Sequence, residues 1–246
     1  MNRDSTIRIS LWSGPRNIST ALMYSFAQRG DARVFDEPLY AHYLASTDAR
    51  NYHPGAEEVL ASQENDGEKV VRDILLGDHD APVVFFKNMT HHLVNLDWSF
   101  LKRLTNVLLT RDPVDMLPSY ADVVKAPTLR DTGYADQVAL LNYLMECGQE
   151  PPVLVADQVL RNPRRVLSRL CERIGIPFDE AMLRWEAGPR PEDGVWAKHW
   201  YGGVHRSTGF NPNRPKTEPF PERLKPLLET CRPYFEHLRE LAITAD

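Results

Sequence analysis

The chain has 246 residues, of which 42% are hydrophobic and 26% are charged, so it is long enough to bury the core of an α/β domain. We expect a single domain over residues 1–246, with its core at about 7–177 and a C-terminal cap at about 188–246. The formal net charge of −5 argues against a general nucleic-acid binder, whose surface would be basic, but it allows a local basic pocket for a small anion.

No stretch of the sequence is apolar over a membrane-spanning length, and no long apolar run precedes the first strand pattern. We therefore expect a cytoplasmic protein without a membrane partner. The three cysteines, Cys147, Cys171 and Cys231, are odd in number, lack metal-binding spacing and lie in helical patterns. They are predicted to be reduced and buried, where they pack like small apolar side chains.

The first predicted element is a strand that runs into a turn and a helix. Ile7, Ile9 and Leu11 alternate with polar residues, which is the period of a strand, and apolar residues recur at helical spacing over 21–27. A helix start presents unpaired backbone N–H groups and the positive end of the helix dipole, so it can bind a phosphate or sulfate. The candidate anion contacts in this turn are Gly14, Pro15, Arg16, Asn17, Ile18, Ser19 and Thr20.

This turn is not a Walker A loop, which needs a second glycine and a lysine directly before the hydroxyl residue. Ile18 occupies the position before Ser19. The guanidinium of Arg16 supplies a permanent charge, and its planar shape suits phosphate and sulfate oxygens. An ordinary strand, turn and helix with a Ser or Thr cap is the alternative interpretation of this segment.

Strand and helix patterns alternate along the rest of the chain. The strand patterns lie at Arg33–Phe35, Val83–Lys87, Val107–Thr110 and Val153–Ala156. The helical patterns lie at about Ala56–Leu76, Leu93–Leu104, Pro113–Val124, Tyr134–Cys147 and Val159–Ile174. This alternation predicts an α/β fold with a parallel sheet flanked by helices. After Gly188 the chain is rich in Pro, Gly, Trp and Arg, which predicts an irregular C-terminal flap before a final helix near Glu222–Leu241.

In such a sheet, ligands bind at the carboxyl ends of the strands. This rule gathers at one edge the segments that directly follow the strands, namely 14–20, 36–38, 87–88, 111–113 and Asp157. Arg111 at the end of the fourth strand and Ser119 in the next helix can together surround a second anion. Two anion sites at one edge indicate a ligand that is phosphorylated at both ends. The alternative for Arg111 is a solvated ion pair with Asp112 or Asp115.

Taken together, these motifs resemble the sulfotransferases that use 3′-phosphoadenosine 5′-phosphosulfate (PAPS). Residues 14–20 (GPRNIST) are similar to that family's loop for the 5′-phosphosulfate, and residues 111–119 (RDPVDMLPS) are similar to its 3′-phosphate motif. Residues 155–177, with an acidic residue after a strand, a basic helix and a Gly-Ile-Pro exit, resemble the segment that follows in many members. The resemblance covers about residues 7–177 and implies a P-loop-type sulfotransferase fold.

The sequence departs from the family pattern in the 5′ loop. Many members carry a lysine followed by Ser-Gly, whereas this chain has Arg16 followed by Asn17 and Ile18, and arginine is familiar there in other branches. Members often close over the nucleotide with a Gly-rich basic loop, to which residues 201–209 (YGGVHRSTG) are loosely similar. This likeness implies donor contacts from Arg206 and Ser207, with a structural loop that carries an exposed arginine as the alternative.

The resemblance implies transfer of a sulfuryl group from PAPS to a hydroxyl or amine of an acceptor, without a metal ion. The acceptor must lose a proton during the attack, which requires a base near the 5′ loop. Glu37, after the second strand, is the first candidate, because a Glu-Pro segment there supplies the base in several branches. His91 and His92 are the rival bases. Arg16 would stabilise the leaving phosphate, and a structural pairing of Glu37 with Arg16 is the alternative.

The acceptor contacts are predicted in two segments. One segment follows Glu37, and the other precedes the flap; their residues are Tyr40, His42, Tyr43, Trp196, Lys198, His199, Trp200 and Tyr201. The second group could instead form the core of the C-terminal cap. We expect a small-molecule acceptor and no nucleic-acid partner, and the sequence leaves a homodimer open. The competing functions are an atypical P-loop nucleotide phosphotransferase and a catalytically silent module that binds a nucleotide or a protein.

Overall fold

The computed structural model of the chain describes residues 6–211 and 218–246. Residues 1–5, which precede the first predicted strand, and residues 212–217 lie outside the described residues. In the described part of the chain, no helix is both long enough and apolar enough to cross a membrane.

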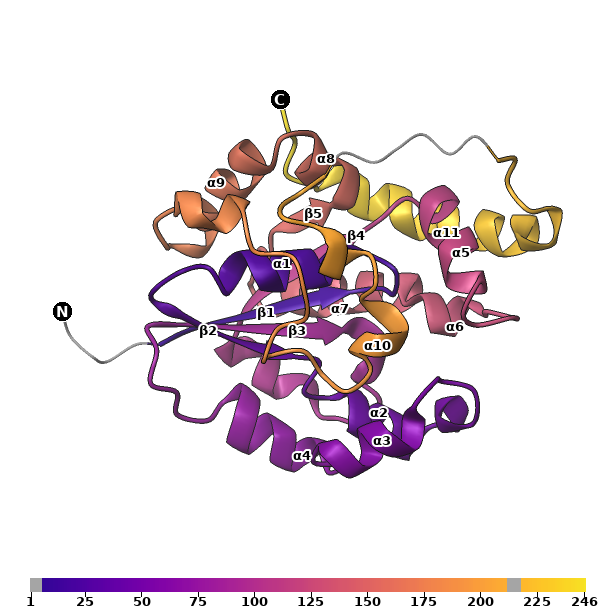
Figure 1. The fold of residues 1–246 in the computed structure, drawn as a ribbon, viewed down its shortest axis with the longest axis horizontal. Coiled ribbons are helices and arrows are strands. Elements are labelled where there is room, and N and C mark those ends of the chain that lie inside the picture. The colour runs from indigo at the N-terminus through magenta and orange to yellow at the C-terminus, as the bar shows by residue number, and fades with distance from the viewer. Residues whose placement is uncertain (1–5, 212–217) are drawn as a thin grey trace.

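One sheet of parallel strands forms the centre of the structure (Figure 1). Its strands are β1 (Ile7–Ser13), β2 (Ala32–Asp36), β3 (Val83–Met89), β4 (Thr105–Thr110) and β5 (Val153–Val155). The strand order is β2-β3-β1-β4-β5, and the register pairs Ile9 of β1 with Phe85 of β3 and Thr105 of β4. The turn after β1 therefore lies between the carboxyl ends of β3 and β4. The predicted α/β fold with a parallel sheet flanked by helices is confirmed.

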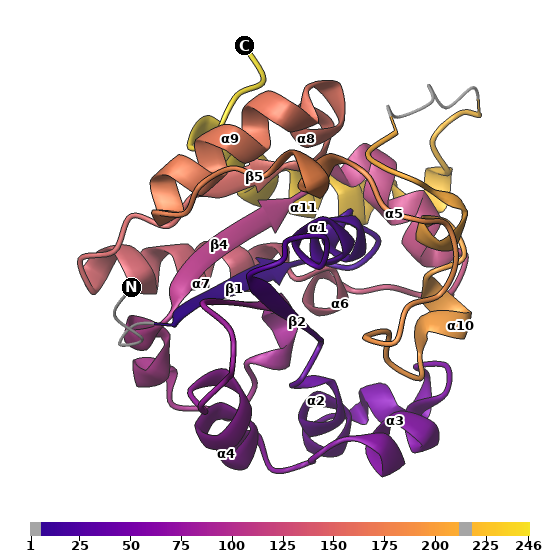
Figure 2. The ribbon, with the colours of Figure 1, turned by 60° about the vertical axis from the view of Figure 1, so that its left-hand side comes forward.

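Helices cover both faces of this sheet. Their bounds are α1 (Ser19–Phe26), α2 (Tyr40–Ser46), α3 (Ala56–Ser62), α4 (Gly67–Val70), α5 (Pro113–Ala121), α6 (Leu129–Thr132), α7 (Tyr134–Glu146), α8 (Ala156–Arg161), α9 (Pro163–Ile174), α10 (Ala197–Trp200) and α11 (Lys225–Glu240). Figure 2 shows α9 and α7 on opposite sides of the sheet.

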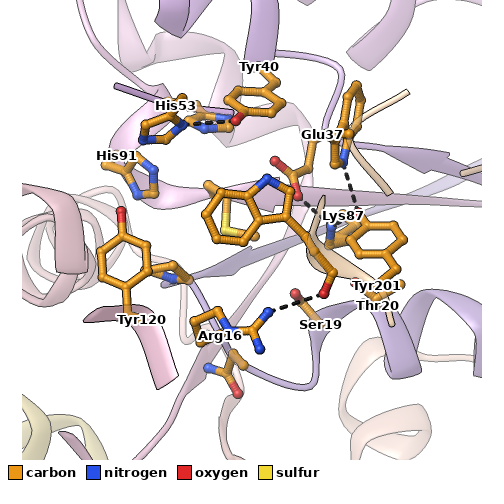
Figure 3. A pocket seen from close by; sticks show the side chains of 16 residues that line it. Arg16, Ser19, Thr20, Glu37, Tyr40, His53, Lys87, His91, Tyr120 and Tyr201 are labelled. Atoms are coloured by element: carbon orange, nitrogen blue, oxygen red, sulfur yellow. Dashed lines mark hydrogen bonds and ion pairs between the residues drawn. The ribbon is translucent and has the colours of Figure 1, made fainter. Parts of the chain in front are cut away.

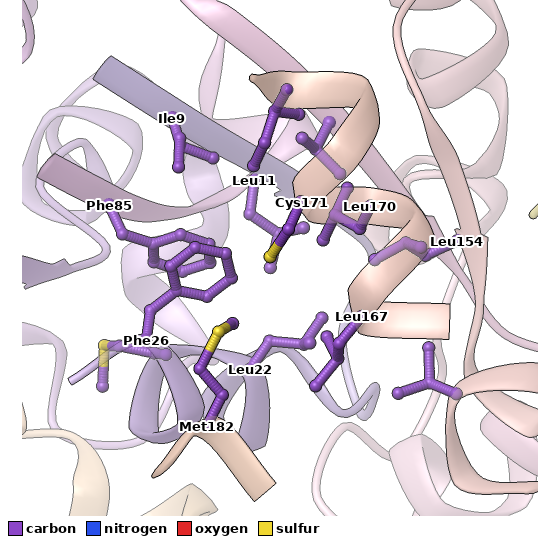
Figure 4. Close-up of a cluster of buried hydrophobic side chains, with 14 of the residues drawn as sticks. Ile9, Leu11, Leu22, Phe26, Phe85, Leu154, Leu167, Leu170, Cys171 and Met182 are labelled. Atoms are coloured by element: carbon purple, nitrogen blue, oxygen red, sulfur yellow. The ribbon is translucent and has the colours of Figure 1, made fainter. Parts of the chain in front are cut away.

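The core on one face joins the sheet to α1 and α9. Leu11 of β1 packs there with Leu22 of α1 and Leu167 of α9 (Figure 4). On the other face, Trp12 packs in the cluster that includes α7. β1 is thus buried on both faces, although polar and apolar residues alternate along it. Its polar residue Ser10 can be buried because its hydroxyl accepts a hydrogen bond from the side chain of Asn88 (2.9 Å).

The prediction of one continuous helix over Ala56–Leu76 is wrong. The chain forms α3, leaves the helix after Ser62, and then forms α4 and a π-helical turn at Val71–Leu75. The second start is set by Asp66, whose Oδ1 accepts the backbone N–H groups of Glu68 (3.0 Å) and Lys69 (3.3 Å). An aspartate at a helix start satisfies N–H groups that have no partner inside the helix, so it favours a new beginning over continuation.

Two further helix predictions need correction. Only a 3₁₀ helix, Trp98–Arg103, forms within Leu93–Leu104. The predicted helix Val159–Ile174 is two helices, α8 and α9, which meet at Asn162 and Pro163. Proline cannot donate its backbone nitrogen to the preceding turn, and the Asn162 side chain accepts the N–H of Arg165 (3.2 Å) instead. Cys171 and Cys231 are buried in α9 and α11 as expected, whereas Cys147 is half-buried just after α7.

Residues 188–211, which we call the flap, cross the carboxyl edge of the sheet and pass in front of α1 (Figure 1). The hydroxyl of Tyr24 in α1 donates to the Asp193 carboxylate (2.8 and 2.7 Å), and the N–H of Gly194 donates to Asp36 Oδ2 (3.0 Å). The flap contains only α10 and a 3₁₀ turn, Val204–Arg206, as regular structure. Its place is therefore set by these side-chain contacts.

Candidate active site

Two adjoining cavities open at the carboxyl edge of the sheet. The histidine-lined cavity, of about 550 Å³, is bordered by Pro15, Arg16, Asn17, Ser19, Thr20, Glu37, Tyr40, His53, Lys87, Met89, His91, His92, Tyr120, Trp196, Trp200 and Tyr201. The arginine-lined cavity, of about 800 Å³, is bordered by Arg16, Asn17, Ile18, Thr20, Ala21, Arg111, Ser119, Leu160, Trp200, Tyr201, Gly203, Val204, Ser207, Gly209, Phe210 and Asn211. Five residues belong to both, so the two predicted anion motifs lie at neighbouring cavities that share a wall.

The turn after β1 combines an uncommon backbone conformation with side-chain anchors. Arg16 has a φ of 51°, a left-handed conformation that costs a residue other than glycine about 1–2 kcal/mol. The Asn17 side chain donates to the carbonyl of Leu109 (3.2 Å) and accepts the N–H of Ile18 (2.9 Å). α1 begins at Ser19, and its N-cap residue, Ile18, makes no side-chain cap hydrogen bond, so the N–H groups of the first turn are not capped by that residue and can bind an anion.

Gly14 and Asp157 were both expected at the binding edge, but the structure places them outside the lining of the two cavities. A Cβ atom at Gly14 would lie 2.7 Å from the carbonyl oxygen of Thr132, so glycine is required there by close packing against α6. Asp157 is exposed on α8. The other residues of the predicted 5′ loop, 15–20, line one or both cavities.

Arg16, Arg111 and Ser119 form what we call the arginine cluster. Arg16 donates through Nε to Ser119 Oγ (2.9 Å) and through Nη1 to the carbonyl of Trp200 (3.1 Å). Arg111 donates through Nη1 to the carbonyl of Arg16 (2.8 Å), while its buried Nε has no partner among the described residues. The sequence assigned Arg16 and Ser119 to different ends of a ligand, but their side chains bond to each other.

The arginine cluster is electrostatically prepared for an anion. Burial and the nearby charge of Arg111 lower the pKa of Arg16, and burial lowers the pKa of Arg111. Two guanidinium groups therefore share a partly buried space that opens into the arginine-lined cavity. A phosphate or sulfate placed there would relieve the repulsion between them and could use the unpartnered Nε of Arg111.

Asp36, Glu37, Lys87 and Tyr201 form what we call the carboxylate cluster; Figure 3 labels Glu37, Lys87 and Tyr201. Lys87 Nζ donates to Asp36 Oδ1 (2.9 Å), Glu37 Oε1 (2.5 Å) and the hydroxyl oxygen of Tyr201 (2.5 Å). The Tyr201 hydroxyl donates to the Asp36 carboxylate, 2.8 Å from each oxygen. The side chains of Asp36 and Lys87 are each 1% exposed, and that of Glu37 is 7% exposed. Glu37 therefore pairs with Lys87, not with Arg16.

The environment of Glu37 suits a group that exchanges a proton. Burial raises the pKa of Glu37, and the neighbouring Lys87 charge only partly opposes that effect. For Lys87, burial lowers the pKa but the two carboxylates outweigh it, so the pKa is raised and the lysine stays charged. Glu37 also has a φ of 40°, and strained backbone of this kind is typical of functional sites.

His53, His91 and His92 line the histidine-lined cavity, and Figure 3 shows His53 and His91 across the cavity from Lys87. Burial lowers the pKa of His91 to about 3 and that of His53 to about 4, and burial also lowers the pKa of His92. The His92 ring stacks on Tyr40 with centroids 5.0 Å apart, and the Tyr40 hydroxyl bonds to His53 Nδ1 (2.8 Å). These imidazoles are therefore neutral polar groups. Among the described residues, no group of three or more His, Cys, Asp or Glu is arranged to hold a metal ion.

The residues predicted as acceptor contacts divide into two groups. Tyr40, Trp196, Trp200 and Tyr201 line the histidine-lined cavity. The remaining members, His42, Tyr43, Lys198 and His199, lie outside its lining. Lys198 forms an exposed ion pair with Glu58 (2.6 Å), His199 is exposed, and His42 Nε2 bonds to the carbonyl of Val94 (2.8 Å). Trp196 and Tyr201 line the cavity and also belong to the buried cluster in which the flap packs against α2 and α3.

The two flap residues predicted to bind the donor have different positions. Ser207 lines the arginine-lined cavity, donates to the carbonyl of Val204 (2.7 Å) and accepts from Trp185 Nε1 (3.2 Å). Arg206 is exposed and lies outside the lining of both cavities. In this conformation only Ser207 is placed to contact a ligand in the arginine-lined cavity.

The sequence placed Lys87 at the binding edge without a chemical role and singled out neither His53 nor Tyr120, although all three line the histidine-lined cavity. Lys87 carried a usable signal, because it ends an apolar strand pattern that is typical of burial on both faces. A buried ammonium group needs an acidic partner, and Asp36 with Glu37 ends the neighbouring strand. For His53 and Tyr120 the sequence carries no comparable signal.

Comparisons with known proteins agree with this geometry. A family model described as a sulfotransferase domain matches residues 7–242. Two Arabidopsis thaliana proteins, named branched-chain-amino-acid aminotransferase-like proteins 1 and 2, are each 40% identical over 94% of this chain. The match covers 41% of the length of each, so this chain spans less than half of these curated relatives.

Solved structures show the same fold. A sulfotransferase from Alicyclobacillus acidocaldarius matches with a TM-score of 0.54 and 13% identity, over 97% of this chain and 98% of that one. A sulfotransferase domain from the curacin biosynthetic pathway matches with a TM-score of 0.52 and 15% identity, over 93% of this chain and 98% of that one. With a family model that covers residues 7–242, the chain belongs to the sulfotransferase domain family.

Proposed function

We propose that the chain transfers a sulfuryl group from PAPS to a hydroxyl or amine of a small acceptor. The observation that carries this proposal is the pair of adjoining cavities: one holds a buried carboxylate, the other holds an arginine with an unpartnered buried nitrogen, and Arg16 borders both. A reaction between a doubly phosphorylated donor and an acceptor that must lose a proton needs these two environments side by side.

In this proposal the donor occupies the arginine-lined cavity. Arg111 and Ser119 bind the 3′-phosphate, and the turn at 15–20 with the start of α1 binds the 5′-phosphosulfate. The bond between sulfur and the bridging oxygen of the 5′-phosphate breaks, and that oxygen keeps the electron pair. Arg16 and the helical N–H groups stabilise its negative charge. Arg16 borders both cavities and can turn toward the leaving group once its bond to Ser119 is exchanged.

The acceptor occupies the histidine-lined cavity, where its oxygen or nitrogen attacks the sulfur and Glu37 takes the proton that is released. The products are the sulfated acceptor and adenosine 3′,5′-bisphosphate. Aromatic rings and uncharged imidazoles make up most of this cavity's far wall, and all three donors of Lys87 are already used. Such a lining favours a small acceptor without a net charge.

Calorimetric titration with adenosine 3′,5′-bisphosphate tests the donor half of this proposal, with Mg·ATP and adenosine 5′-monophosphate as comparison ligands. We expect micromolar binding of the bisphosphate and much weaker binding of the other two. Binding of Mg·ATP alone would move the protein to the phosphotransferases. Binding of none of the three would favour a catalytically silent interaction module.

Transfer itself is tested with labelled PAPS and a panel of hydroxyl and amine acceptors. Glu37→Gln should bind the bisphosphate normally and lose transfer, whereas Glu58→Gln, a change in an exposed carboxylate, should keep both. Arg16→Ala should lower turnover by about a hundredfold or more. Loss of bisphosphate binding in Glu37→Gln would show that this residue is structural.

A further inference from the structure

The flap contributes a hydroxyl group to the carboxylate cluster. An ammonium group has three N–H donors, and those of Lys87 go to Asp36, Glu37 and the hydroxyl oxygen of Tyr201. Asp36 ends β2, Glu37 follows it, and Lys87 lies in β3. Tyr201 lies 114 positions after Lys87, directly after α10. The hydrogen-bonding of this cluster is therefore completed only when the flap lies over the sheet edge.

The Tyr201 hydroxyl affects the competition between two carboxylates for one lysine. It donates to Asp36 (2.8 Å to each oxygen) and so satisfies part of the hydrogen-bonding capacity of that carboxylate. The indole N–H of Trp196, also in the flap, donates to the same hydroxyl (3.0 Å) and holds it in place. Without the hydroxyl, Asp36 would depend on Lys87 more strongly, and Lys87 would be drawn away from Glu37.

The neighbouring flap residue contacts the other half of the site. The carbonyl of Trp200 accepts a hydrogen bond from Arg16 Nη1 (3.1 Å), and both Trp200 and Tyr201 line both cavities. Two consecutive flap residues thus bond to the proposed leaving-group arginine and to the lysine that holds the proposed base. A movement of the flap changes both contacts together.

From this geometry we propose that Tyr201 is a positioning residue that couples closure of the flap to the readiness of Glu37 to accept a proton. The inference rests on the proposed function, because it assigns Glu37 as the base. Tyr201 lines both cavities, but the role proposed for it does not depend on contact with a ligand. It acts through Lys87 and Asp36, so that Glu37 becomes an effective base when the flap is closed.

The direction of the effect follows from the groups that face Glu37. Burial raises the pKa of Glu37, the charge of Lys87 lowers it, the charge of Asp36 raises it, and the Tyr201 hydroxyl lowers it. The phenol of Tyr40 also faces this carboxylate and stays protonated, because burial and the Glu37 charge raise its pKa. Removal of the Tyr201 hydroxyl should therefore leave Glu37 protonated up to a higher pH.

The test compares Tyr201→Phe with Tyr24→Phe. Both variants remove one hydroxyl that anchors the flap, but Tyr24 bonds to Asp193 and not to the carboxylate cluster. In the pH dependence of turnover, we expect Tyr201→Phe to move the acidic midpoint up by about 0.5–1 pH unit, the size of one hydrogen bond. Tyr24→Phe should leave the midpoint in place. An unmoved midpoint in Tyr201→Phe overturns the proposal.

A second variant predicts a shift of opposite sign. Asp36→Asn removes the competing negative charge, so Glu37 is the one carboxylate of the cluster that remains paired with Lys87. The acidic midpoint of the pH dependence of turnover should therefore fall. A third readout does not need turnover: carboxyl ¹³C resonances of the folded proteins, with Glu37→Gln used for assignment, report the titration of Glu37 directly. If the wild type transfers no sulfuryl group, the proposed function fails. If Glu37 titrates identically in the wild type and in Tyr201→Phe, this inference fails whatever the activity.

Discussion

The carboxylate cluster and the arginine cluster lie on the two sides of one site, but they differ in how far their charges and hydrogen-bond donors are paired within the protein. In the carboxylate cluster every donor of Lys87 is used, and the charges are nearly excluded from water. In the arginine cluster two like charges approach each other, and the buried Nε of Arg111 has no partner in the described part of the chain. The first cluster is complete without a ligand, and the second needs one.

This difference predicts which cluster contributes to the stability of the fold and which contributes to ligand affinity. A buried ion pair is costly to break because removal of one partner leaves an uncompensated charge. Neighbouring arginines raise the free energy of the unliganded protein, so an anion that neutralises them gains that energy as binding. Changes in the carboxylate cluster should therefore appear mainly in folding and proton transfer, and changes in the arginine cluster mainly in ligand binding.

The largest effect is expected from Lys87→Met. It leaves the carboxyl groups of Asp36 and Glu37 buried without their cation, which should lower the free energy of unfolding by about 3–5 kcal/mol. Urea unfolding at pH 7 measures this change. Lys198→Met is the matched control, because its ion pair with Glu58 is exposed and should contribute less than about 1 kcal/mol. Equal losses in the two variants would show that the buried lysine contributes no more to stability than an exposed ion pair.

The same variant has an expected pH dependence. Without Lys87 the folded protein should bind more protons than the unfolded chain, because the buried carboxyl groups then have raised pKa values. Stability that depends on such groups increases as the pH falls through the raised pKa values. Lys87→Met should therefore regain stability relative to the wild type between pH 7 and pH 5.

Arg111→Ala tests the arginine cluster, where we expect the effect to appear in ligand binding. Loss of charge-assisted hydrogen bonds should weaken the binding of adenosine 3′,5′-bisphosphate by about 10- to 150-fold. The free energy of unfolding of the unliganded protein should stay the same or rise. Calorimetry with adenosine 5′-phosphosulfate, which lacks the 3′-phosphate, supplies the comparison and should show almost no loss. Arg130→Ala, a change in an exposed arginine that lines neither cavity, should behave as the wild type. Equal weakening of both ligands would remove Arg111 from the 3′ site.

His91 provides a third case, because it is buried like the carboxylate cluster but stays uncharged. Burial lowers its pKa to about 3, so the unfolded chain binds a proton there between about pH 6.5 and pH 3 and the folded protein does not. The free energy of unfolding should therefore decrease as the pH is lowered, and His91 should account for about 2 kcal/mol of the decrease between pH 7 and pH 5. Urea unfolding of His91→Gln should show a smaller fall, and His199→Gln, a change in an exposed histidine, should match the wild type.

The smallest effect is expected from Ser119→Ala. The hydroxyl of Ser119 accepts one hydrogen bond from Arg16 (2.9 Å) and would exchange it for a bond to the 3′-phosphate. Because one charge-assisted bond replaces another, the net contribution of Ser119 to binding should be only about 0.5–1.5 kcal/mol. Bisphosphate affinity should fall by about 2- to 10-fold, with little change in the melting temperature. A loss as large as that of Arg111→Ala would show that Ser119 organises the whole cluster.

Residues 7–20 show how much of the fold the sequence predicts. The change from strand to helical period gave β1, the turn and the start of α1 at Ser19 as the structure has them. The helix predicted over Ala56–Leu76 was wrong, because a local cap at Asp66 outweighed the apolar periodicity. Periodicity reports which face is buried, but caps and prolines decide where a helix ends.

The site shows the same limit more strongly. The strand pattern was enough to predict that Glu37, the turn at 15–20 and Arg111 meet at one sheet edge, because parallel strands carry the residues after them to the same side. The folded structure was needed to show that Glu37 pairs with Lys87, that Arg16 bonds to Ser119, and that Tyr201 completes the carboxylate cluster from the flap. These contacts join residues 50 to 114 positions apart. Packing sets such contacts, and no local spacing in the sequence encodes them.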